Sequence, residues 1–143
     1  MKIRDIMTSA VITIGEEAPL VEAARVMKEN DIGALPVLNE GVCTGIITDR
    51  DIVVRAIAEG QDPYTATIRD AMTTDCVFCF EDQDLEEGVQ MMEDHHIRRL
   101  LVTDRNERLV GILTLQNIAD ADDETLSSEA LEAVTEPETA GAA

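Results

Sequence analysis

The sequence predicts an α/β fold: two β-α-β-β-α repeats that pack about a pseudo-two-fold axis, followed by an acidic C-terminal tail. The first observation is a duplication, because Arg-Asp-Ile-Met-Thr at 4–8 returns as Arg-Asp-Ala-Met-Thr at 69–73, 65 residues later. The same offset places Met27 on Met92 and Val37 on Val102. Repetition at a fixed period indicates two copies of one structural unit. Each copy has roughly 60 residues, too few for a secure core alone, so the copies should fold together.

In the first copy, apolar spacing and turn residues predict five elements. They are a strand at 11–14, a helix at 18–30, strands at 35–38 and 42–48, and a helix at 49–59. Pro19 suits a first helical turn, where its missing N–H is not needed. Asn39-Glu40-Gly41 suits the turn between the two adjacent strands. Thr48 or Asp49 is expected to cap the last helix.

The second copy repeats this order, with a strand at 76–80, a helix at 84–95, strands at 99–103 and 108–113, and a helix from 115. The predicted domain organisation is repeat 1 at 1–60, a linker at 61–67, repeat 2 at 68–121 and the tail at 122–143. Within the tail, 125–134 can form one or two amphipathic turns, and 135–143 has the composition of a disordered end.

The chain is strongly acidic, with 30 acidic and 11 basic residues and a formal net charge of −19. Only Lys2 and Lys28 are lysine. A surface of this charge repels nucleic acid. It is typical of a protein kept soluble in molar salt, where counterions screen the repulsion between acidic side chains. The alternative is a mesophilic protein with an acidic tail. Residues 120–143 carry eight acids, which is less than half of the net charge.

Composition also predicts a cytoplasmic location. No run of about 18 apolar residues is present, so no membrane partner is expected. The three cysteines, Cys43, Cys76 and Cys79, are an odd number, which favours reduced thiols over a disulfide framework. Cys76 and Cys79 have the spacing of a metal knuckle, but positions three apart on a strand point to opposite faces. A burial role is favoured, and no metal site is predicted.

Together, the duplication, the Asp-x-Met-Thr openings, Leu-Pro-Val at 35–37 and Gly-Ile-Ile-Thr-Asp-Arg-Asp-Ile at 45–52 resemble a tandem CBS-domain pair, or Bateman module. The resemblance covers residues 1–121. It implies a regulatory module that binds AMP, ADP, ATP or S-adenosylmethionine in clefts between the copies. It also implies a homodimer, a protein partner in trans, and neither catalysis nor a catalytic cofactor.

The residues at the end of the 42–48 strand agree with that implication. A helix begins directly after Thr48, so free backbone N–H groups and the positive end of the helix dipole lie at the junction. Asp51 could accept hydrogen bonds from two ribose hydroxyls, and Thr48 could bond phosphate or sugar. The alternative is that the two residues only form a capping box. In the second copy Thr114 is kept, but Asn117 replaces the carboxylate, which predicts weaker nucleotide binding or a different ligand there.

The family builds each cleft from the Thr and Asp of one copy and the strand starts of the other. The resemblance therefore assigns to the first cleft Thr48, Asp51, Val77, Ile97 and Arg98. It assigns to the second Thr114, Asn117, His96, Thr8, Ile12, Ile32 and Gly33. Basic residues in the turn at 95–99 hold phosphate in nucleotide-binding relatives, although Arg98 and Arg99 could instead pair with surface acids.

Two other functions compete with ligand sensing. One is a structural protein-interaction module with vestigial clefts, which Asn117 favours. The other is a small metal-dependent enzyme, against which the shortage of metal ligands argues. His95 and His96 form no catalytic pair that the sequence supports, since no Ser or Cys nucleophile stands in a recognisable setting beside them.

Overall fold

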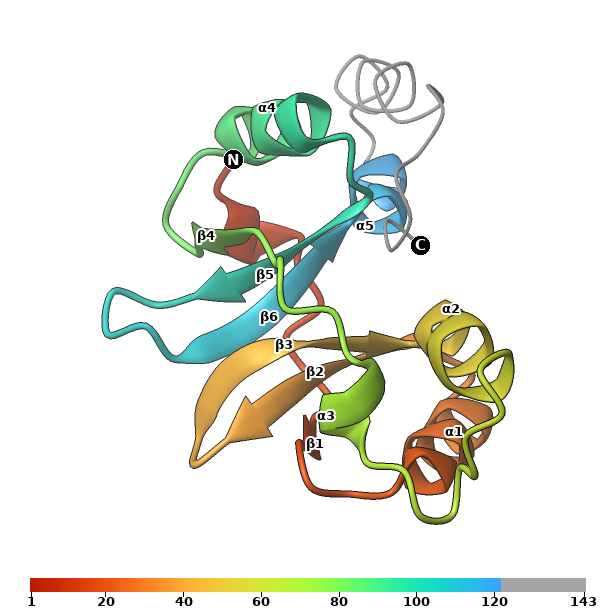
Figure 1. Cartoon of the computed structure of the whole chain (residues 1–143). Coiled ribbons are helices and arrows are strands. Elements are labelled where there is room, and N and C mark those ends of the chain that lie inside the picture. Colours follow the sequence, from red (N-terminus) through yellow and green to blue (C-terminus); the bar gives the residue numbers. More distant parts are fainter. Residues whose placement is uncertain (122–143) are drawn as a thin grey trace. The chain divides into compact units, whose positions relative to one another are not determined.

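The computed structural model describes residues 1–121, so the predicted tail, including its possible turns at 125–134, lies outside the described residues. The chain forms two compact units (Figure 1). The first-repeat unit consists of Ile12–Cys76. The second-repeat unit combines Met1–Val11 with the described residues from Val77 to 121. The mixed α/β class and the duplicated architecture predicted from the sequence are confirmed.

The first-repeat unit is a three-stranded sheet with helices packed against it. Its elements are β1 (Ile14–Gly15), α1 (Leu20–Asn30), β2 (Ala34–Asn39), β3 (Val42–Thr48), α2 (Asp49–Asp51), the π-helix η2 (Ile52–Ile57) and α3 (Ile68–Ala71). The strand order is β1-β2-β3, with β1 parallel and β3 antiparallel to β2. Leu20, Leu35 and Ile47 are fully buried in the core between sheet and helices. Burial of these apolar side chains is what holds α1 on the sheet.

The second-repeat unit has the same construction. Its elements are the 3₁₀ helix η1 (Ile3–Asp5), β4 (Phe78–Phe80), α4 (Leu85–His95), β5 (Arg99–Thr103), β6 (Leu109–Thr114) and α5 (Leu115–Asp120). The strand order is β4-β5-β6, again with one parallel and one antiparallel pair. Its core contains the repeat-equivalents of the first core, Leu85, Leu100 and Leu113, all nearly or fully buried.

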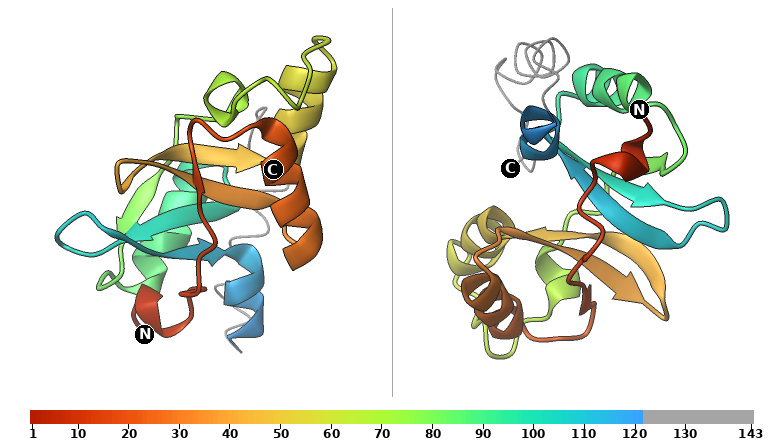
Figure 2. Two further views of the ribbon diagram at one scale, coloured as in Figure 1. Left: turned by 90° about the horizontal axis from the view of Figure 1, so that it is seen from below. Right: turned by 180° about the vertical axis from the view of Figure 1, so that it is seen from behind.

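The segment that precedes each repeat in the sequence, called its leading segment below, packs on the other repeat. In the first-repeat unit the N–H of Leu20, which opens α1, donates to the carbonyl of Ala66 at 2.9 Å. In the second, the N–H of Leu85 opens α4 and donates to the carbonyl of Met1 at 2.9 Å. Figure 2 shows the N-terminal segment running beside the sheet of the second-repeat unit. Each leading segment therefore supplies acceptors to N–H groups that a helix start leaves without partners.

Because of this exchange, the segment predicted as a linker also has a structural role. Residues 61–67 do not merely connect the repeats, because the carbonyl of Pro63 accepts a hydrogen bond from the N–H of Val21 at 2.9 Å. The segment 61–67 therefore belongs to the compact unit Ile12–Cys76. The domain bounds drawn from the sequence, with repeats at 1–60 and 68–121, stay a prediction.

Two glycines let the leading segments approach the sheets. On β3, a Cβ at Gly45 would lie 2.5 Å from the carbonyl oxygen of Thr73. On β6, a Cβ at Gly111 would lie 2.9 Å from the carbonyl oxygen of Thr8 and 2.5 Å from Met7 Sδ. The N–H of the next residue along each strand, Ile46 in the first case, donates to that same carbonyl oxygen. A side chain at either glycine would push the leading segment away.

Several predicted element boundaries differ from the structure, and three of them have a clear physical reason or a change in helix geometry. The first strand was expected at 11–14, but β1 begins at Ile14, because its ladder with β2 pairs only Ile14 with Val37 and Gly15 with Leu38. The strand expected at 76–80 begins at Phe78 for the same reason, since β4 pairs with β5 only over Phe78–Phe80. The helix expected at 49–59 changes from α to π geometry at Ile52 and ends at Ile57.

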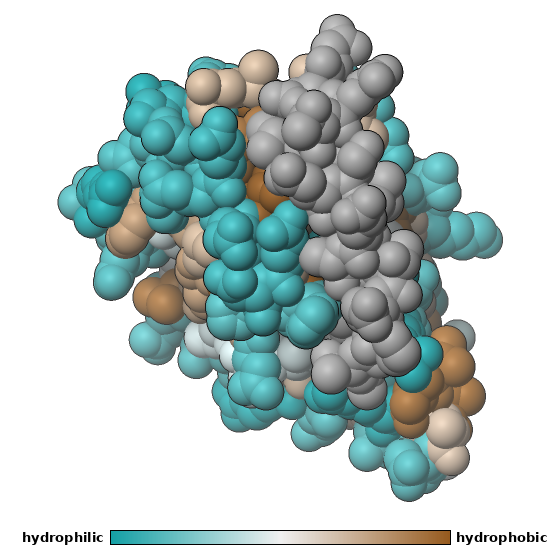
Figure 3. Space-filling model, turned by 90° about the horizontal axis from the view of Figure 1, so that it is seen from above, coloured by the Kyte–Doolittle hydropathy of each residue, from teal (hydrophilic) through white to brown (hydrophobic). Residues whose placement is uncertain are grey.

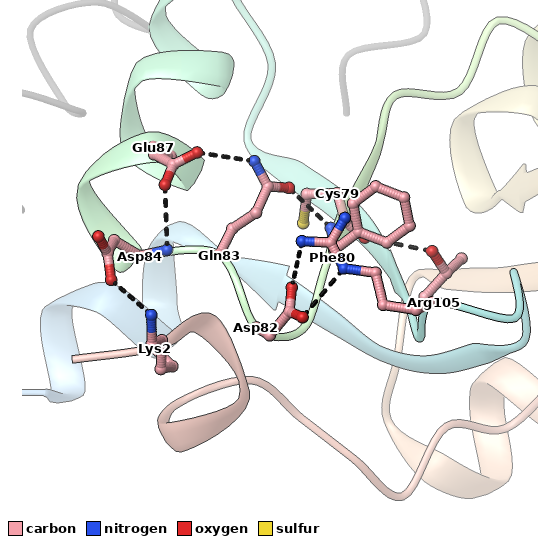
Figure 4. A network of polar contacts seen from close by, with 9 residues as sticks. Lys2, Cys79, Phe80, Asp82, Gln83, Asp84, Glu87 and Arg105 are labelled. Atoms are coloured by element: carbon pink, nitrogen blue, oxygen red, sulfur yellow. Dashed lines mark hydrogen bonds and ion pairs between the residues drawn. The ribbon is translucent and has the colours of Figure 1, made fainter.

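A polar network fixes the turn between β4 and α4 (Figure 4). Arg105 donates two hydrogen bonds to Asp82, at 2.8 and 2.9 Å, and its guanidinium lies 4.0 Å from the ring centre of Phe80. At the helix side of the turn, Lys2 Nζ donates to Asp84 at 3.1 Å. These contacts connect the β5–β6 hairpin and the N-terminal leading segment to the turn between β4 and α4. Their role is therefore structural.

The face shown in Figure 3 is mostly hydrophilic, with apolar side chains at a few places. Of the residues with a described placement, none belongs to a helix with the length and apolar character needed to span a bilayer.

Candidate functional site

The junction of β3 and α2 is held by a reciprocal pair of hydrogen bonds. The N–H of Asp51 donates to Thr48 Oγ1 at 3.0 Å, and the N–H of Thr48 donates to Asp51 Oδ2 at 3.0 Å. Thr48 itself is extended, with φ −115° and ψ 162°, as an N-cap residue should be. The capping box expected from the spacing is therefore present. It fixes the Asp51 carboxylate at the positive end of the helix.

Asp51 has further partners. Its carboxylate is 2% exposed and receives the hydroxyl of Thr73, at 3.1 Å from Oδ1 and 3.3 Å from Oδ2. Arg55 Nε lies 3.6 Å from Oδ1, and Arg55 also donates to the carbonyl of Met72 at 3.2 Å. A buried carboxylate is costly unless it is paired and hydrogen-bonded, and this one has both kinds of partner.

The second-repeat unit repeats this arrangement with one chemical change. Thr114 and Asn117 form the same box, with the N–H of Thr114 donating to Asn117 Oδ1 at 2.9 Å. Because a backbone N–H can bond only the amide oxygen, the Asn117 NH₂ group must face the other way. It donates to Thr8 Oγ1 at 3.2 Å. The direction of the hydrogen bond to the leading-segment threonine is thus reversed between the repeats.

The reversal gives the two sites opposite polar character. At Asp51 the threonine hydrogen is used and carboxylate lone pairs remain, so the site offers acceptors to a ligand with hydroxyl groups. At Asn117 the hydroxyl hydrogen of Thr8 and the second amide N–H remain, so the site offers donors. A ribose diol suits the first site better than the second.

Each unit also brings a predicted strand-start residue next to its junction. The carbonyl of Gly33 accepts from the N–H of Asp49 at 3.0 Å, and a Cβ at Gly33 would lie 3.2 Å from the Asp49 carboxylate. In the other unit the carbonyl of Arg98 accepts from the N–H of Leu115 at 3.1 Å. The structure therefore brings Gly33 to Thr48 and Asp51, and Arg98 to Thr114 and Asn117, in each case within one unit.

The remaining predicted residues lie around these junctions or in the cores. Ile32 packs against the first core, and Ile97 and Val77 pack against the second. Ile12 is exposed. His96 is exposed and ends α4 in the left-handed region, with φ 52°. Each of the two predicted clefts draws on residues of both units, so the clefts themselves stay predictions.

Sequence reasoning missed Thr73 and Arg55 as partners of Asp51. Thr73 was available from the duplication, because it is the repeat-equivalent of Thr8, which was assigned to a cleft. Arg55 lies four residues after Asp51, a spacing at which helical side chains meet. No spacing rule links Thr73 to Asp51, which are 22 residues apart.

Cys76 and Cys79, which have the spacing of a metal knuckle, lie in different units. Cys79 is buried on β4 in the second-repeat unit, and Cys76 belongs to the first-repeat unit. Burial raises the pKa of Cys79 to about 12. Within residues 1–121, no group of three or more His, Cys, Asp or Glu side chains is arranged to hold a metal ion.

Comparison with known proteins agrees with this duplicated geometry. The family model described as CBS domain matches the chain twice, over residues 3–57 and 68–124. The protein YhcV of Bacillus subtilis, itself described as CBS domain-containing, is 40% identical over 117 residues, which is 82% of each chain.

Two solved structures are similar to the chain. Hypoxic Response Protein I, solved with two coordinated zinc ions, has a TM-score of 0.75 and 38% identity, covering 85% of this chain and 98% of that one. The CBS domain pair of protein MJ0100, solved with 5′-methylthioadenosine and S-adenosyl-L-methionine, also has a TM-score of 0.75. It is 28% identical, covering 87% of this chain and 98% of that one.

Proposed function

This chain belongs to the CBS domain family, and we propose that it is a regulatory module that binds an adenosyl compound and communicates its occupancy to a protein partner. The observation that carries the proposal is the buried Asp51 carboxylate, held at a helix start by Thr48 and Thr73. Such a group suits a ribose diol, and the related CBS pair of MJ0100 was solved with two adenosyl ligands. AMP, ADP, ATP and S-adenosylmethionine are the candidate ligands.

The proposed mechanism needs no catalysis. A ligand that contacts residues of both repeats would favour one arrangement of the repeats over others. A partner protein then responds only if it binds the two states with different affinity. The proposed first cleft combines Thr48 and Asp51 with Val77, Ile97 and Arg98. The proposed second combines Thr114, Asn117, Thr8 and His96 with Ile12, Ile32 and Gly33.

The experiment is thermal unfolding of the full chain with each candidate ligand, in about 2 M KCl to screen the acidic surface. A ligand at 100 times its Kd adds roughly 2.7 kcal/mol of stability. The matched variant is Asp51→Asn, because Asn117 shows that an amide can form the same capping box. We expect a ligand that raises the Tm of the parent and raises it much less in Asp51→Asn. If every ligand leaves the Tm of both proteins unchanged, the sensing function is rejected.

A structural interaction module is the second candidate function. It is favoured by the fact that both junction side chains already have intrachain partners, Thr73 for Asp51 and Thr8 for Asn117. In that case the two capping boxes only begin helices. Asp51→Asn then lowers the Tm of the chain by the same amount with and without ligand.

A homodimer is the assembly we propose. Val53 and Ile57 on η2 are 58% and 49% exposed, and Val54 beside them is also exposed. Neighbouring apolar side chains on one helix are suited to pack against a second copy. Light scattering should report a dimer for the parent and a monomer for Val53→Glu combined with Ile57→Glu. The control is Val42→Glu, which changes an equally exposed valine, 62% exposed on β3. A monomeric parent would contradict the dimer.

Location and source are proposed on composition. We place the protein in the cytoplasm, where its three thiols stay reduced, and in a salt-loving organism, because of its net charge of −19. A Tm that rises steeply with KCl, without any ligand, would support the second point.

A further inference from the structure

Two cysteines of the first-repeat unit lie on segments joined by an antiparallel bridge. Ile46 on β3 and Thr73 exchange both backbone hydrogen bonds, at 2.9 and 2.8 Å. Three residues before Ile46 is Cys43, and three residues after Thr73 is Cys76. Counted outward from this single bridge, the two cysteines occupy equivalent positions on the two segments.

Side-chain contacts support the same placement. Cys43 Sγ lies 3.5 Å from the carbonyl oxygen of Gly45, and Cys76 Sγ lies 3.5 Å from that of Thr73. Gly45 and Thr73 are themselves in close contact, since a Cβ at Gly45 would lie 2.5 Å from the Thr73 oxygen. Each sulfur atom therefore lies 3.5 Å from a carbonyl oxygen of one of the two residues that form this contact.

The electrostatics of the thiols indicate that they are near one another. Burial raises the pKa of both, and that of Cys76 reaches about 11. After burial, the next causes for Cys76 are the nearby Cys43 and Asp51. For Cys79, in the other unit, burial alone is the cause.

The duplication shows that the fold does not require this pair. The repeat offset carries Cys76 onto Val11 and Cys43 onto Leu109, in the second-repeat unit. There the corresponding positions are apolar and have no redox chemistry. A pair of thiols at these two positions is therefore a property of the first repeat.

We infer that Cys43 and Cys76 are a reversible redox site, which a peroxide converts to an intramolecular disulfide. The thiolate of one cysteine attacks a peroxide oxygen, the O–O bond breaks, and a sulfenic acid and water are formed. The second thiol attacks the sulfenic sulfur, the S–S bond forms and a second water leaves. In total, two thiols and one hydrogen peroxide give one disulfide and two waters.

The disulfide would tie the segment after Thr73 to β3, directly before the chain leaves the first-repeat unit. The loop it closes is long, so it should stabilise the folded chain by constraining the unfolded one. Because Thr73 also donates to Asp51, oxidation should alter the affinity of the ligand site. That last consequence rests on the proposed function, whereas formation of the disulfide does not.

The test uses the reduced full chain without ligand. It is treated with hydrogen peroxide, remaining thiols are alkylated in the folded state, and the products are mapped by mass spectrometry. We expect a linked Cys43–Cys76 peptide in the monomer, lost on treatment with dithiothreitol, with Cys79 modified only after unfolding. The oxidised chain should have the higher Tm. Because the thiolate is the reactive form, the initial rate should rise roughly tenfold per pH unit between about pH 7 and pH 9.

Serine variants of the three cysteines show which thiols form the disulfide. Cys43→Ser and Cys76→Ser should each abolish the intramolecular link, and Cys79→Ser should leave it intact. The inference is overturned if both thiols of the folded chain stay free after peroxide. It is equally overturned if they oxidise singly to sulfinic acids, or link only between chains. A ligand panel without effect would reject the proposed function and leave this result unchanged.

Discussion

The hydroxyl of Thr73 donates to both carboxylate oxygens of Asp51, across 22 residues of sequence and from a segment that leads into the other repeat. In the second repeat the equivalent threonine, Thr8, accepts from Asn117 instead. The two repeats thus share a geometry and differ in the charge at its centre.

Thr73→Val should destabilise the chain more than Thr8→Val does. The first change removes a hydrogen bond to a charged group, worth about 1.5–3 kcal/mol, and the second removes a neutral one, worth about 0.5–1.5 kcal/mol. Valine keeps the branched shape in both cases. Urea unfolding measures the two losses. Equal losses would mean that the charge of Asp51 adds nothing to the contact.

Gly45→Ala should destabilise the first-repeat unit by about 1–3 kcal/mol, because the added methyl would meet a backbone carbonyl that cannot rotate away. The control is Gly15→Ala on β1, where a Cβ would meet nothing within 4 Å. That change should alter stability by less than about 1 kcal/mol. Thermal or urea unfolding of both variants measures the difference, and a tolerated Gly45→Ala would contradict the close approach of Thr73.

Glu16 should make stability depend on acid pH. It is 7% exposed, and hydrogen bonds from Thr44 at 2.7 Å and Arg69 at 2.8 Å lower its pKa below the ordinary 4.5. A lowered pKa means that this stabilisation is complete above 4.5 and is lost as the pH falls through the folded-state value.

The measurement is the Tm of the parent and of Glu16→Gln as the pH is lowered from neutrality. The gap between them should narrow once the pH is below about 4.5. Glu17→Gln is the matched control, because Glu17 also pairs with Arg69 but is well exposed. A gap that stays constant over the whole range would show that the charge of Glu16 is not involved.

Asn117→Asp should strengthen ligand binding at the second repeat. It restores a carboxylate where Thr8 can donate, as Thr73 does to Asp51. One charge-assisted hydrogen bond of about 1.5–3 kcal/mol corresponds to a roughly ten- to hundredfold gain in affinity. Calorimetry of the ligand identified by thermal unfolding would report the gain, and unchanged binding would show that the residue at 117 does not contact ligand.

Much of the fold could be predicted because it depends on local patterns and on the duplication. Strand and helix order followed from apolar spacing, and the capping box at Thr48 and Asp51 followed from a three-residue interval. Strand starts were wrong where pairing decides them. Val11 and Ile12 have strand-forming side chains, but within residues 1–121 no partner strand extends beside them. The length of a strand is set by its neighbour, which a local pattern does not contain.

The exchange of leading segments could not be predicted from periodicity. The 65-residue period of the sequence is the same whether each leading segment packs on its own copy or on the other copy. The contacting residues are equivalent in the two copies, so the period does not distinguish the two arrangements. Thr73 was missed as a partner of Asp51 for this reason. The site could be predicted as far as one strand and its following helix, and the remainder depends on contacts between distant parts of the chain.

The exchanged segments have a consequence for how a chain of this kind could arise. A single ancestral repeat of this sequence would leave its main helix start incomplete until a second molecule supplied a leading segment, so its folding would depend on protein concentration. Joining two copies end to end places both segments on one polypeptide and removes that dependence. The self-contained stretch is Ile12–Cys76, and a fragment cut at the repeat boundary, 1–60, lacks Pro63, Ala66 and α3.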